Sequence, residues 1–160
     1  MSQNTYSQQL SYRRATEQDL PSILKLLVED ELGKKREFLN KESEQYYLEA
    51  FKKIDADFNH YLMVIELENK LVGTCHLTLL PSLTFRGVTR LQVESVHVAE
   101  SFRGNGVGRW MFQKIFTYAK KHQASIIQLT TNKKRLGAKK FYERLGFKAT
   151  HEGMKYQQVL

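Results

Sequence analysis

The sequence predicts a mixed α/β sheet with helices on both faces. Segments in which apolar and polar residues alternate, typical of strands, occur among segments of helical periodicity. A glycine-rich stretch separates one alternating segment, Leu91–Val98, from an amphipathic helical segment. The 160 residues, of which 41% are hydrophobic, suffice for one domain with a sizeable core, and no linker divides them.

A short strand and two helices are predicted before residue 60. The strand covers Ser11–Arg14. Thr16 then caps a helix from about Glu17 to Glu31, because leucine, isoleucine and valine recur at helical spacing and Pro21 falls in the first turn. A second helix is expected from about Lys41 to Ile54, where aromatic and aliphatic side chains form one apolar stripe.

Three further strands are predicted between residues 61 and 98. Tyr61–Leu67 and Leu71–Leu80 are expected to pair around the turn Glu68–Lys70. Pro81–Thr89 is expected to form a loop. Arg90–Val98, in which apolar and polar residues alternate, is expected to be the next strand.

The last third of the chain is predicted to alternate between helices and strands. A helix from about Asn105 to His122 has a broad apolar face. The strand Ile126–Thr131 follows, and then a helix from about Lys134 to Leu145, which Gly146 ends. Met154–Leu160 is expected to be a final strand.

The stretch Arg103–Gly108, with the sequence Arg-Gly-Asn-Gly-Val-Gly, is predicted to hold phosphate. Its three glycines lack Cβ atoms, so the backbone N–H groups can close around a bulky anion. The helix that follows adds unpaired N–H groups and the positive end of its dipole. This stretch is therefore a candidate anion site.

The composition indicates a basic protein of a reducing compartment. Lysine and arginine number 25 against 17 acidic residues, a net charge of +8, and the excess lies in the last third. A nucleic acid would explain this charge, and a small polyphosphate ligand explains it equally well. Cys75 has no partner for a disulfide, Met1–Gln9 lacks the apolar core of a secretory signal, and no apolar run could span a bilayer. We therefore expect a cytoplasmic protein with a flexible tail over residues 1–9.

These motifs together resemble the GNAT superfamily of N-acetyltransferases. Arg103–Gly108 matches the family signature Gln/Arg-x-x-Gly-x-Gly/Ala, with arginine at its first position. Val93–Val98 is similar to the family's fourth strand, and Leu129–Asn132 and Ala138–Phe147 are similar to its fifth strand and fourth helix. The resemblance is close from about Tyr61 onward. It implies a single N-acetyltransferase domain over residues 1–160, with a mostly antiparallel twisted sheet whose fourth and fifth strands splay apart.

By this resemblance acetyl-CoA is the acetyl donor. The backbone of Val96 and Val98 would bind the pantetheine arm and polarise the thioester carbonyl, and Asn132 would hydrogen-bond the same arm. The pyrophosphate would bind the loop residues Arg103, Gly104, Asn105, Gly106, Val107 and Gly108. One or two members of a basic cluster would meet the 3′-phosphate, although such a run is also typical of a solvated surface: Lys133, Lys134, Arg135 and Lys139.

Two residues are candidates for acid–base chemistry. An alkyl ammonium with a pKa near ~10 is mostly protonated at neutral pH, so acetyl transfer to an amine needs a base. Glu94 is the candidate base, because it lies four residues before Val98 and would share its face on a regular strand; the alternative is a surface carboxylate paired with a basic neighbour. By the resemblance Tyr142 is the acid that protonates the departing thiolate; the alternative is packing on the sheet beside Phe141.

Cysteine and histidine are expected to play no catalytic or metal-binding part. Cys75 lies in an alternating strand without an evident acid–base partner, which favours a place in the core. His97, near Glu94, is assigned to the core or the surface rather than to the acceptor. No metal site is expected, because the five histidines show no ligand spacing: His60, His76, His97, His122 and His151.

The sequence leaves the acceptor open. By the resemblance it lies between the first two helices and the loop before the fourth strand. Arg86 or Arg90 would suit an acidic acceptor. Acidic residues would suit a cationic one, such as a diamine, a polyamine or an aminoglycoside-like amine, but they would equally form a solvated helix end: Glu29, Asp30, Glu31, Glu37, Glu42 and Glu44.

Several other functions compete with this interpretation. A dinucleotide-binding oxidoreductase or a P-loop enzyme is disfavoured, because neither Gly-x-Gly-x-x-Gly after the first strand nor Gly-Lys-Ser/Thr occurs. No aromatic and basic platform accompanies the charge, which disfavours nucleic acid. A protein or peptide lysine or N-terminal acetyltransferase and a noncatalytic acetyl-CoA sensor stay open, although a sensor needs neither Glu94 nor Tyr142. We expect an N-acetyltransferase acting on a small-molecule amine in a ternary complex, without a nucleic-acid or membrane partner; a homodimer is left open.

Overall fold

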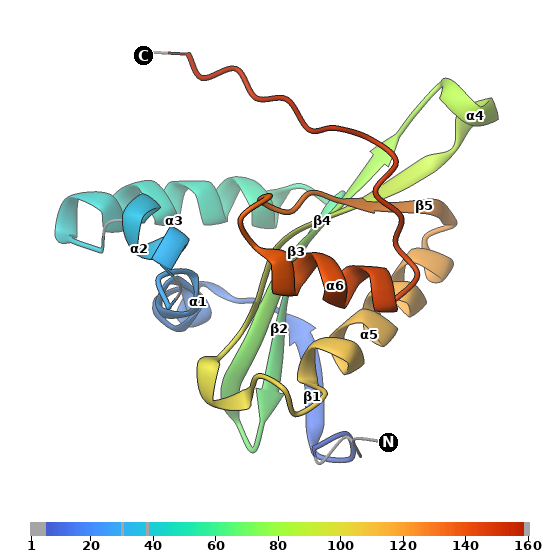
Figure 1. Ribbon diagram of the computed structural model, residues 1–160. Helices are drawn as coiled ribbons and strands as arrows, with labels where there is room; N and C mark the ends of the chain where they lie inside the picture. Colours follow the sequence, from blue (N-terminus) through green and yellow to red (C-terminus); the bar gives the residue numbers. More distant parts are fainter. Residues whose placement is uncertain (1–5, 30, 38, 159–160) are drawn as a thin grey trace. The chain divides into compact units, whose positions relative to one another are not determined.

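The structure, a computed structural model, describes residues 6–29, 31–37 and 39–158 (Figure 1). The chain forms two compact units, residues 1–128 and residues 129–160. The sequence expectation of one domain stays a prediction. Among the described residues, no helix is both long enough and apolar enough to cross a lipid bilayer.

The first unit is built on a sheet whose strands follow chain order. These strands are β1 (Leu10–Arg14), β2 (His60–Leu67), β3 (Lys70–Pro81), β4 (Thr89–Val98) and β5 (Ala124–Leu129). Neighbouring strands from β1 to β4 are antiparallel. β5 runs parallel to β4, and the long helix α5 (Val107–Lys121) connects the two. The predicted mixed, mostly antiparallel sheet is confirmed.

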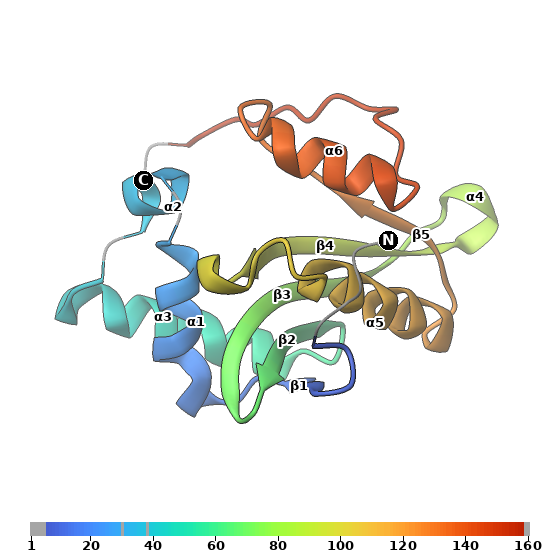
Figure 2. The same cartoon turned by 60° about the horizontal axis from the view of Figure 1, so that its bottom comes forward.

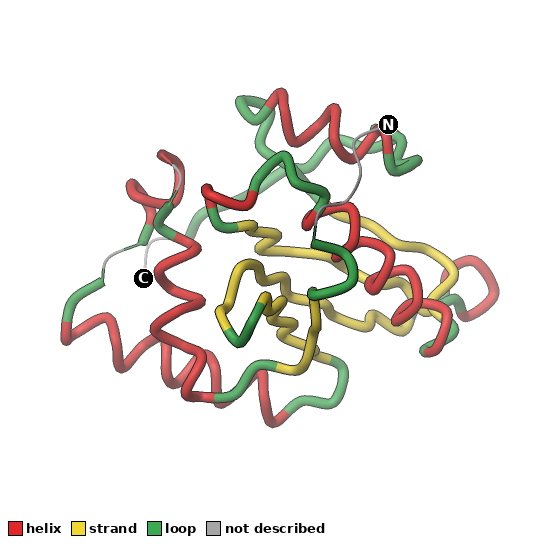
Figure 3. The backbone as a smooth tube through the Cα atoms, turned by 90° about the horizontal axis from the view of Figure 1, so that it is seen from below, coloured by secondary structure: helices red, strands yellow, loops and turns green. Residues whose placement is uncertain are grey.

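Helices cover both faces of this sheet (Figure 2), and the strands run between them in the backbone trace (Figure 3). On one face, α1 (Leu20–Leu27) and α3 (Lys41–Ala56) place Ile23 and Phe51 in a buried cluster with Val64 of β2. On the other face, the Cε atom of Met111 in α5 lies 3.0 Å from the position that a Cβ would take at Gly73 of β3. The core therefore has two layers, one on each side of the sheet.

Local sequence signals explain several element boundaries. Asn40 begins α3, because its side-chain oxygen accepts from the Ser43 backbone N–H at 2.8 Å. Glu68 and Asn69 have left-handed φ values of 49° and 64°, as a tight hairpin between β2 and β3 requires. Leu67 and Lys70 consequently face each other across the turn.

The predicted first helix is divided in the structure. A 3₁₀ turn, η1 (Glu17–Asp19), precedes α1, which ends at Leu27, and a separate short helix, α2, covers Glu31–Arg36. The expected continuous helix from Glu17 to Glu31 is therefore wrong. The acidic run at residues 29–31 explains the break, since negative charge at a helix C-terminus opposes the helix dipole.

The predicted loop between β3 and β4 contains one helical turn, α4 (Thr84–Gly87). Phe85, Arg86 and Gly87 have φ values of 51°, 63° and 81°, so this turn is left-handed. Phe85 is 72% exposed. The turn forms the tip of a long hairpin (Figure 1).

The second unit contains helix α6 (Leu136–Arg144), which ends before Gly146 with its left-handed φ of 96°. The predicted final strand over Met154–Leu160 is wrong, because residues 147–158 contain no strand and residues 159–160 lie outside the described residues. Met154 and Tyr156 are more than 90% exposed. Two apolar side chains among polar neighbours bury too little surface to hold a strand against a sheet.

Candidate functional site

The candidate site is built around a bulge in β4. The register between β3 and β4 shifts between Thr74 and His76, because Ser95 and Val96 together face Cys75. Ser95 takes a left-handed φ of 50°, which is uncommon for a residue other than glycine. The bulge therefore sits at a position of backbone strain, as functional sites often do.

The bulge puts Glu94 and Val98 on opposite faces of the sheet. Glu94 faces His76, on the side of α1 and α3, whereas Val98 faces Gly73, on the side of Met111 and α5. The expectation that Glu94 and Val98 share a face is wrong, because one inserted residue inverts the alternation of a strand. Glu94 is exposed on its face.

The end of β4 presents backbone groups away from β3. The Ala99 N–H donates to the Val72 carbonyl at 2.8 Å, so in the antiparallel pattern the Val98 N–H points to the opposite side. Gln128 of β5 donates to the Gln92 side chain at 2.8 Å. This bond indicates that β5 lies beside the start of β4, and β4 continues beyond it to Val98.

The glycine loop has the geometry of an anion site. Gly104 and Gly106 adopt left-handed φ values of 78° and 84°. Gly108 instead lies in the first turn of α5. The first intrahelical bond runs from the Trp110 N–H to the Gly106 carbonyl, so in the described chain the N–H groups of Val107–Arg109 have no intrahelical acceptor. They are free to meet an anion at the positive end of a 15-residue helix.

Arg103 and Glu29 fasten this loop to the rest of the first unit. The Arg103 Nε donates to the Val98 carbonyl at 2.9 Å, and its guanidinium lies 3.7 Å from the Glu29 carboxylate. The same carboxylate accepts from the Glu100 N–H at 2.9 Å. Asn105 donates to the Arg103 carbonyl at 3.2 Å. Glu29, for which the sequence left open either a cationic acceptor or a solvated helix end, holds the loop between β4 and α5.

The other acidic candidates are dispersed. Glu37 accepts from the Tyr47 hydroxyl at 2.8 Å. Glu42 and Glu44 are exposed in the first turn of α3, where they suit the helix dipole. Two members of the predicted set lie outside what the structure describes: Asp30 and the side chain of Glu31.

The arginines suggested for an acidic acceptor lie on the hairpin between β3 and β4. Arg86 is in the left-handed turn α4, and Arg90 is in β4 opposite Leu80. The Nε atom of Arg90 is buried without a hydrogen-bond partner among the described residues. The two arginines occupy different elements of the hairpin.

Cys75 and His97 are buried in the first unit. Cys75 is fully buried, and burial raises the pKa of its thiol well above the ordinary value. A thiolate nucleophile is therefore disfavoured at this position. His97 is 7% exposed and faces Thr74 across the strands. The expected place of Cys75 in the core is confirmed, and His97, expected in the core or at the surface, lies in the core.

Sequence reasoning missed the contact between two histidines. His76 of β3 and His60 of β2 approach each other, with His76 Nε2 2.8 Å from His60 Nδ1. Both lie on the sheet face that also carries Glu94. The two residues are 16 positions apart, so only the strand register could bring them together.

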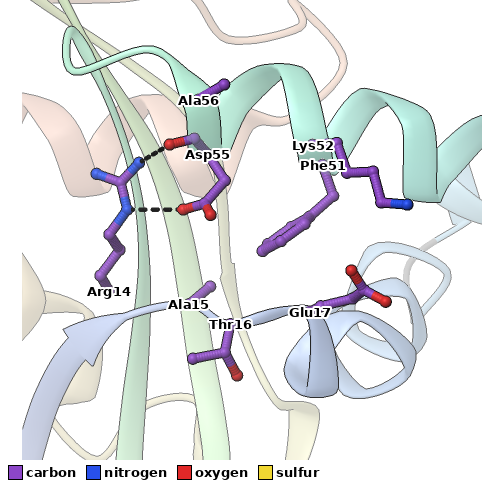
Figure 4. A pocket seen from close by; sticks show the side chains of 8 residues that line it. All are labelled: Arg14, Ala15, Thr16, Glu17, Phe51, Lys52, Asp55 and Ala56. Carbon is purple, nitrogen blue, oxygen red and sulfur yellow. Dashed lines mark hydrogen bonds and ion pairs between the residues drawn. The ribbon is translucent and has the colours of Figure 1, made fainter.

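The structure also contains a hollow that the sequence did not indicate. A cavity of about 440 Å³ lies between the end of β1 and α3 (Figure 4), and its lining includes Arg14, Glu17, Lys52 and Asp55. Arg14 donates to the Asp55 side chain and main chain, each at 3.1 Å. The Arg14 guanidinium and the Asp55 carboxylate in the lining are therefore already paired with each other.

The second unit holds the remaining predicted residues. The Asn132 side-chain oxygen accepts from the Lys134 N–H at 2.9 Å, which closes a local turn after β5. Tyr142 lies in α6, where its ring contacts Phe141 and Phe147 with centroid separations of 5.3 and 6.0 Å.

The basic cluster also belongs to the second unit. Lys133 lies 4.0 Å from Glu152, and Lys139 lies 3.9 Å from Glu143. Both are exposed ion pairs, which contribute little to stability. Among the described residues, no three histidine, cysteine, aspartate or glutamate side chains are grouped to hold a metal ion.

Two sequence comparisons found proteins similar to this chain. The sequence model of the acetyltransferase (GNAT) family matches residues 21–147. A Methanocaldococcus jannaschii protein described as an uncharacterized N-acetyltransferase is 30% identical over 138 residues, 84% of this chain and 59% of that protein. The chain thus spans less than two thirds of that relative's length.

Solved structures share the fold. A transcriptional regulator from Bacillus halodurans C-125 has 40% identity and a TM-score of 0.89, covering 93% of this chain and 99% of the other. A candidate acetyltransferase from Agrobacterium tumefaciens str. C58 has 26% identity and a TM-score of 0.81, covering 92% and 99%.

Proposed function

This chain belongs to the acetyltransferase (GNAT) family, and we propose that it transfers the acetyl group of acetyl-CoA to a primary amine of a small molecule. The observation that carries the proposal is the run from Glu94 to Gly108. Within it a bulge presents a carboxylate on one face of the sheet, and an outward Val98 N–H and an anion loop follow directly. A base, a donor for an acyl oxygen and a phosphate site therefore lie on consecutive segments.

The residues present fit acetyl-CoA. Gly104 and Gly106 shape a concave backbone at the start of α5, which suits a pyrophosphate. The backbone of Val96 and Val98 would meet the pantetheine arm, because β4 extends beyond β5 there. Asn132 would hydrogen-bond the same arm through its amide N–H, since its side-chain oxygen is used in the turn.

The proposed chemistry is direct attack by the amine. When bound, acetyl-CoA supplies an activated acyl carbon. Glu94 takes a proton from the acceptor ammonium, directly or through water, so that the nitrogen lone pair forms the new C–N bond as the C–S bond breaks. Tyr142 supplies a proton to the departing thiolate. The burial of Cys75 supports direct transfer, because an acyl-cysteine route needs an accessible thiolate.

Fewer acidic side chains are available to bind a cationic acceptor than the sequence suggested. Glu29 and Glu37 are engaged within the chain, so the exposed pair Glu42 and Glu44 is what supports binding of a second ammonium group. We therefore propose a small primary amine as the acceptor class, without a requirement for a polyamine.

A regulatory function is the second candidate. It is favoured by the relative from Bacillus halodurans, which is described as a transcriptional regulator, and by the net charge of +8. Such a protein would bind nucleic acid with an affinity that falls steeply as salt rises. It would not depend on the Glu94 carboxylate.

The test is release of free thiol from acetyl-CoA across a panel of diamines, polyamines, aminoglycosides, aminophosphonates and lysine peptides. We expect turnover with at least one small amine, and a loss of about 100-fold or more in kcat for Glu94→Gln. Tyr142→Phe should slow turnover and spare acetyl-CoA binding. Matched controls are Glu68→Gln in the exposed β2–β3 turn and Tyr156→Phe, which is 93% exposed. Binding of acetyl-CoA with no turnover on any amine would contradict the proposal.

A further inference from the structure

A row of ionisable side chains crosses the sheet on the face of Glu94. His76 of β3 faces Glu94 of β4, and His60 of β2 faces Thr78 of β3. The two imidazoles meet through His76 Nε2 and His60 Nδ1 at 2.8 Å, with ring centroids 5.0 Å apart. Beyond them, His60 Nε2 lies 3.8 Å from the Asp57 carboxylate. The order across the sheet is therefore carboxylate, imidazole, imidazole, carboxylate.

The Asp57 carboxylate lies 3.8 Å from His60 Nε2, beyond hydrogen-bond distance, and biases the proton positions through its charge. A carboxylate accepts and cannot donate, so it favours a proton on His60 Nε2. In neutral His60 the Nδ1 atom is then the acceptor, and the hydrogen bond at 2.8 Å requires His76 Nε2 to be the donor. The Nδ1 atom of neutral His76 is consequently unprotonated. Glu94 is its cross-strand neighbour by register, so a proton would pass from the Glu94 carboxyl group to this nitrogen through water.

We propose that His76 and His60 carry the proton that Glu94 takes from the acceptor to Asp57 and the solvent. This proposal rests on the proposed function. Protonated Glu94 gives its proton to His76 Nδ1, while the Nε2 proton of His76 passes to His60 Nδ1. The Nε2 proton of His60 passes to Asp57 or water, and Glu94 is again a carboxylate. The step moves one proton outward and leaves both imidazoles in the opposite tautomer, so each ring exchanges its proton with water before the next turnover.

Exposure rises from His76 outward to Asp57, and Glu94 at the other end of the row is itself exposed. His76 is half-buried, the His60 side chain is 29% exposed and that of Asp57 is 46% exposed. Burial, together with His60, lowers the pKa of His76 to about 4, so a proton does not stay on it at neutral pH. The other charged groups beside the row are Arg14 of β1, which donates to the His60 carbonyl at 2.9 Å, and its ion-pair partner Asp55.

Kinetic variants separate proton transfer from packing. His76→Gln keeps an amide N–H that can donate to His60 but cannot relay a proton. We expect its kcat to fall about tenfold or more, with KM for acetyl-CoA within about twofold of the wild type. His76→Ala should recover activity when imidazole is added. His151→Gln, exposed in the second unit, is the matched control and should keep full activity.

Two results would overturn the relay. One is a kcat of His76→Gln within twofold of the wild type while Glu94→Gln is inactive, which leaves the proposed function standing. The other is a low kcat of His76→Ala that imidazole does not restore, which indicates packing alone. A wild type that acetylates no amine would instead overturn the proposed function, and the relay with it.

A second measurement is independent of turnover. ¹⁵N spectra of the wild-type imidazole rings at neutral pH should show His76 protonated at Nε2 and bare at Nδ1. A His76 ring protonated at Nδ1 would overturn the proposed direction. The same spectra should show His60 protonated at Nε2.

Discussion

Gly104 offers a direct test of the anion loop. Its φ of 78° lies in the left-handed region, and no described atom lies within 4 Å of the position that a Cβ would take. Gly104→Ala therefore costs the backbone strain alone, about 1–2 kcal/mol of the free energy of unfolding. For a chain of this size the melting temperature should fall by roughly 2–8 °C. The added methyl group also enters the concave site, so the Kd for acetyl-CoA should rise about tenfold, or ~1.4 kcal/mol.

Two other glycines provide matched controls. Gly87 has a φ of 81° and equally open space, but it lies at the tip of the β3–β4 hairpin. Gly87→Ala should lose about the same 1–2 kcal/mol and leave acetyl-CoA binding unchanged. Gly137 also has open space and no left-handed φ, within α6. Gly137→Ala should be neutral or stabilise the fold by up to about 1 kcal/mol.

Thermal unfolding and isothermal titration calorimetry measure the two quantities separately. Strain at Gly104 is refuted if Gly104→Ala has the melting temperature of the wild type while Gly87→Ala has a lower one. The assignment of the loop to the CoA pyrophosphate is refuted if Gly104→Ala and Gly87→Ala bind acetyl-CoA with equal affinity.

Three further predictions concern other contacts of the first unit. Hydrogen bonds from Arg13 lower the pKa of Asp19 from 3.8 to about 2. The wild type should therefore have a free energy of unfolding about 1–2 kcal/mol higher than Asp19→Asn at pH 7. In denaturant titrations this difference should disappear as the pH falls from 4 to 2, because Asp19 becomes protonated. A constant difference over that range would contradict it. Gly73→Ala should lower the free energy of unfolding by about 1–3 kcal/mol, because its Cβ would lie 3.0 Å from Met111 Cε and 3.2 Å from the His97 carbonyl oxygen. An unchanged free energy of unfolding would show that the strands adjust freely. Glu29→Ala should raise KM for acetyl-CoA about three- to tenfold at constant kcat, because the loop carrying Arg103 loses its anchor, and an unchanged KM would remove that role.

Much of the fold followed from local sequence patterns. The hairpin of β2 and β3 was predicted because alternating segments flank a short polar turn, and Glu68 and Asn69 do adopt left-handed conformations. The helix after the glycine loop was predicted from its apolar periodicity; α5 begins two residues later, at Val107, and ends one residue earlier, at Lys121. The expected strand at Met154 failed, because its pattern lacked a burial partner.

The candidate site was predicted less completely. Glu94 and the glycine loop could be named from spacing and resemblance, because both lie in one continuous segment. The bulge at Ser95 could not be predicted, since no glycine marks it, and it moved Glu94 to the face opposite Val98. Glu29 was named as one candidate to meet a cationic acceptor, but it accepts from the Glu100 N–H, 71 positions along the chain.

By itself the sequence determined the family, most of the strands and helices in chain order, and the segment that we propose to meet phosphate. These properties depend on periodicity, on glycine and on short motifs, which act over a few neighbouring residues. The tertiary structure alone decided which face of the sheet carries Glu94 and which side chains accompany it there. The pairing of His60 with His76 and their row toward Asp57 arise from the registers of three strands, and register is a property of the folded sheet.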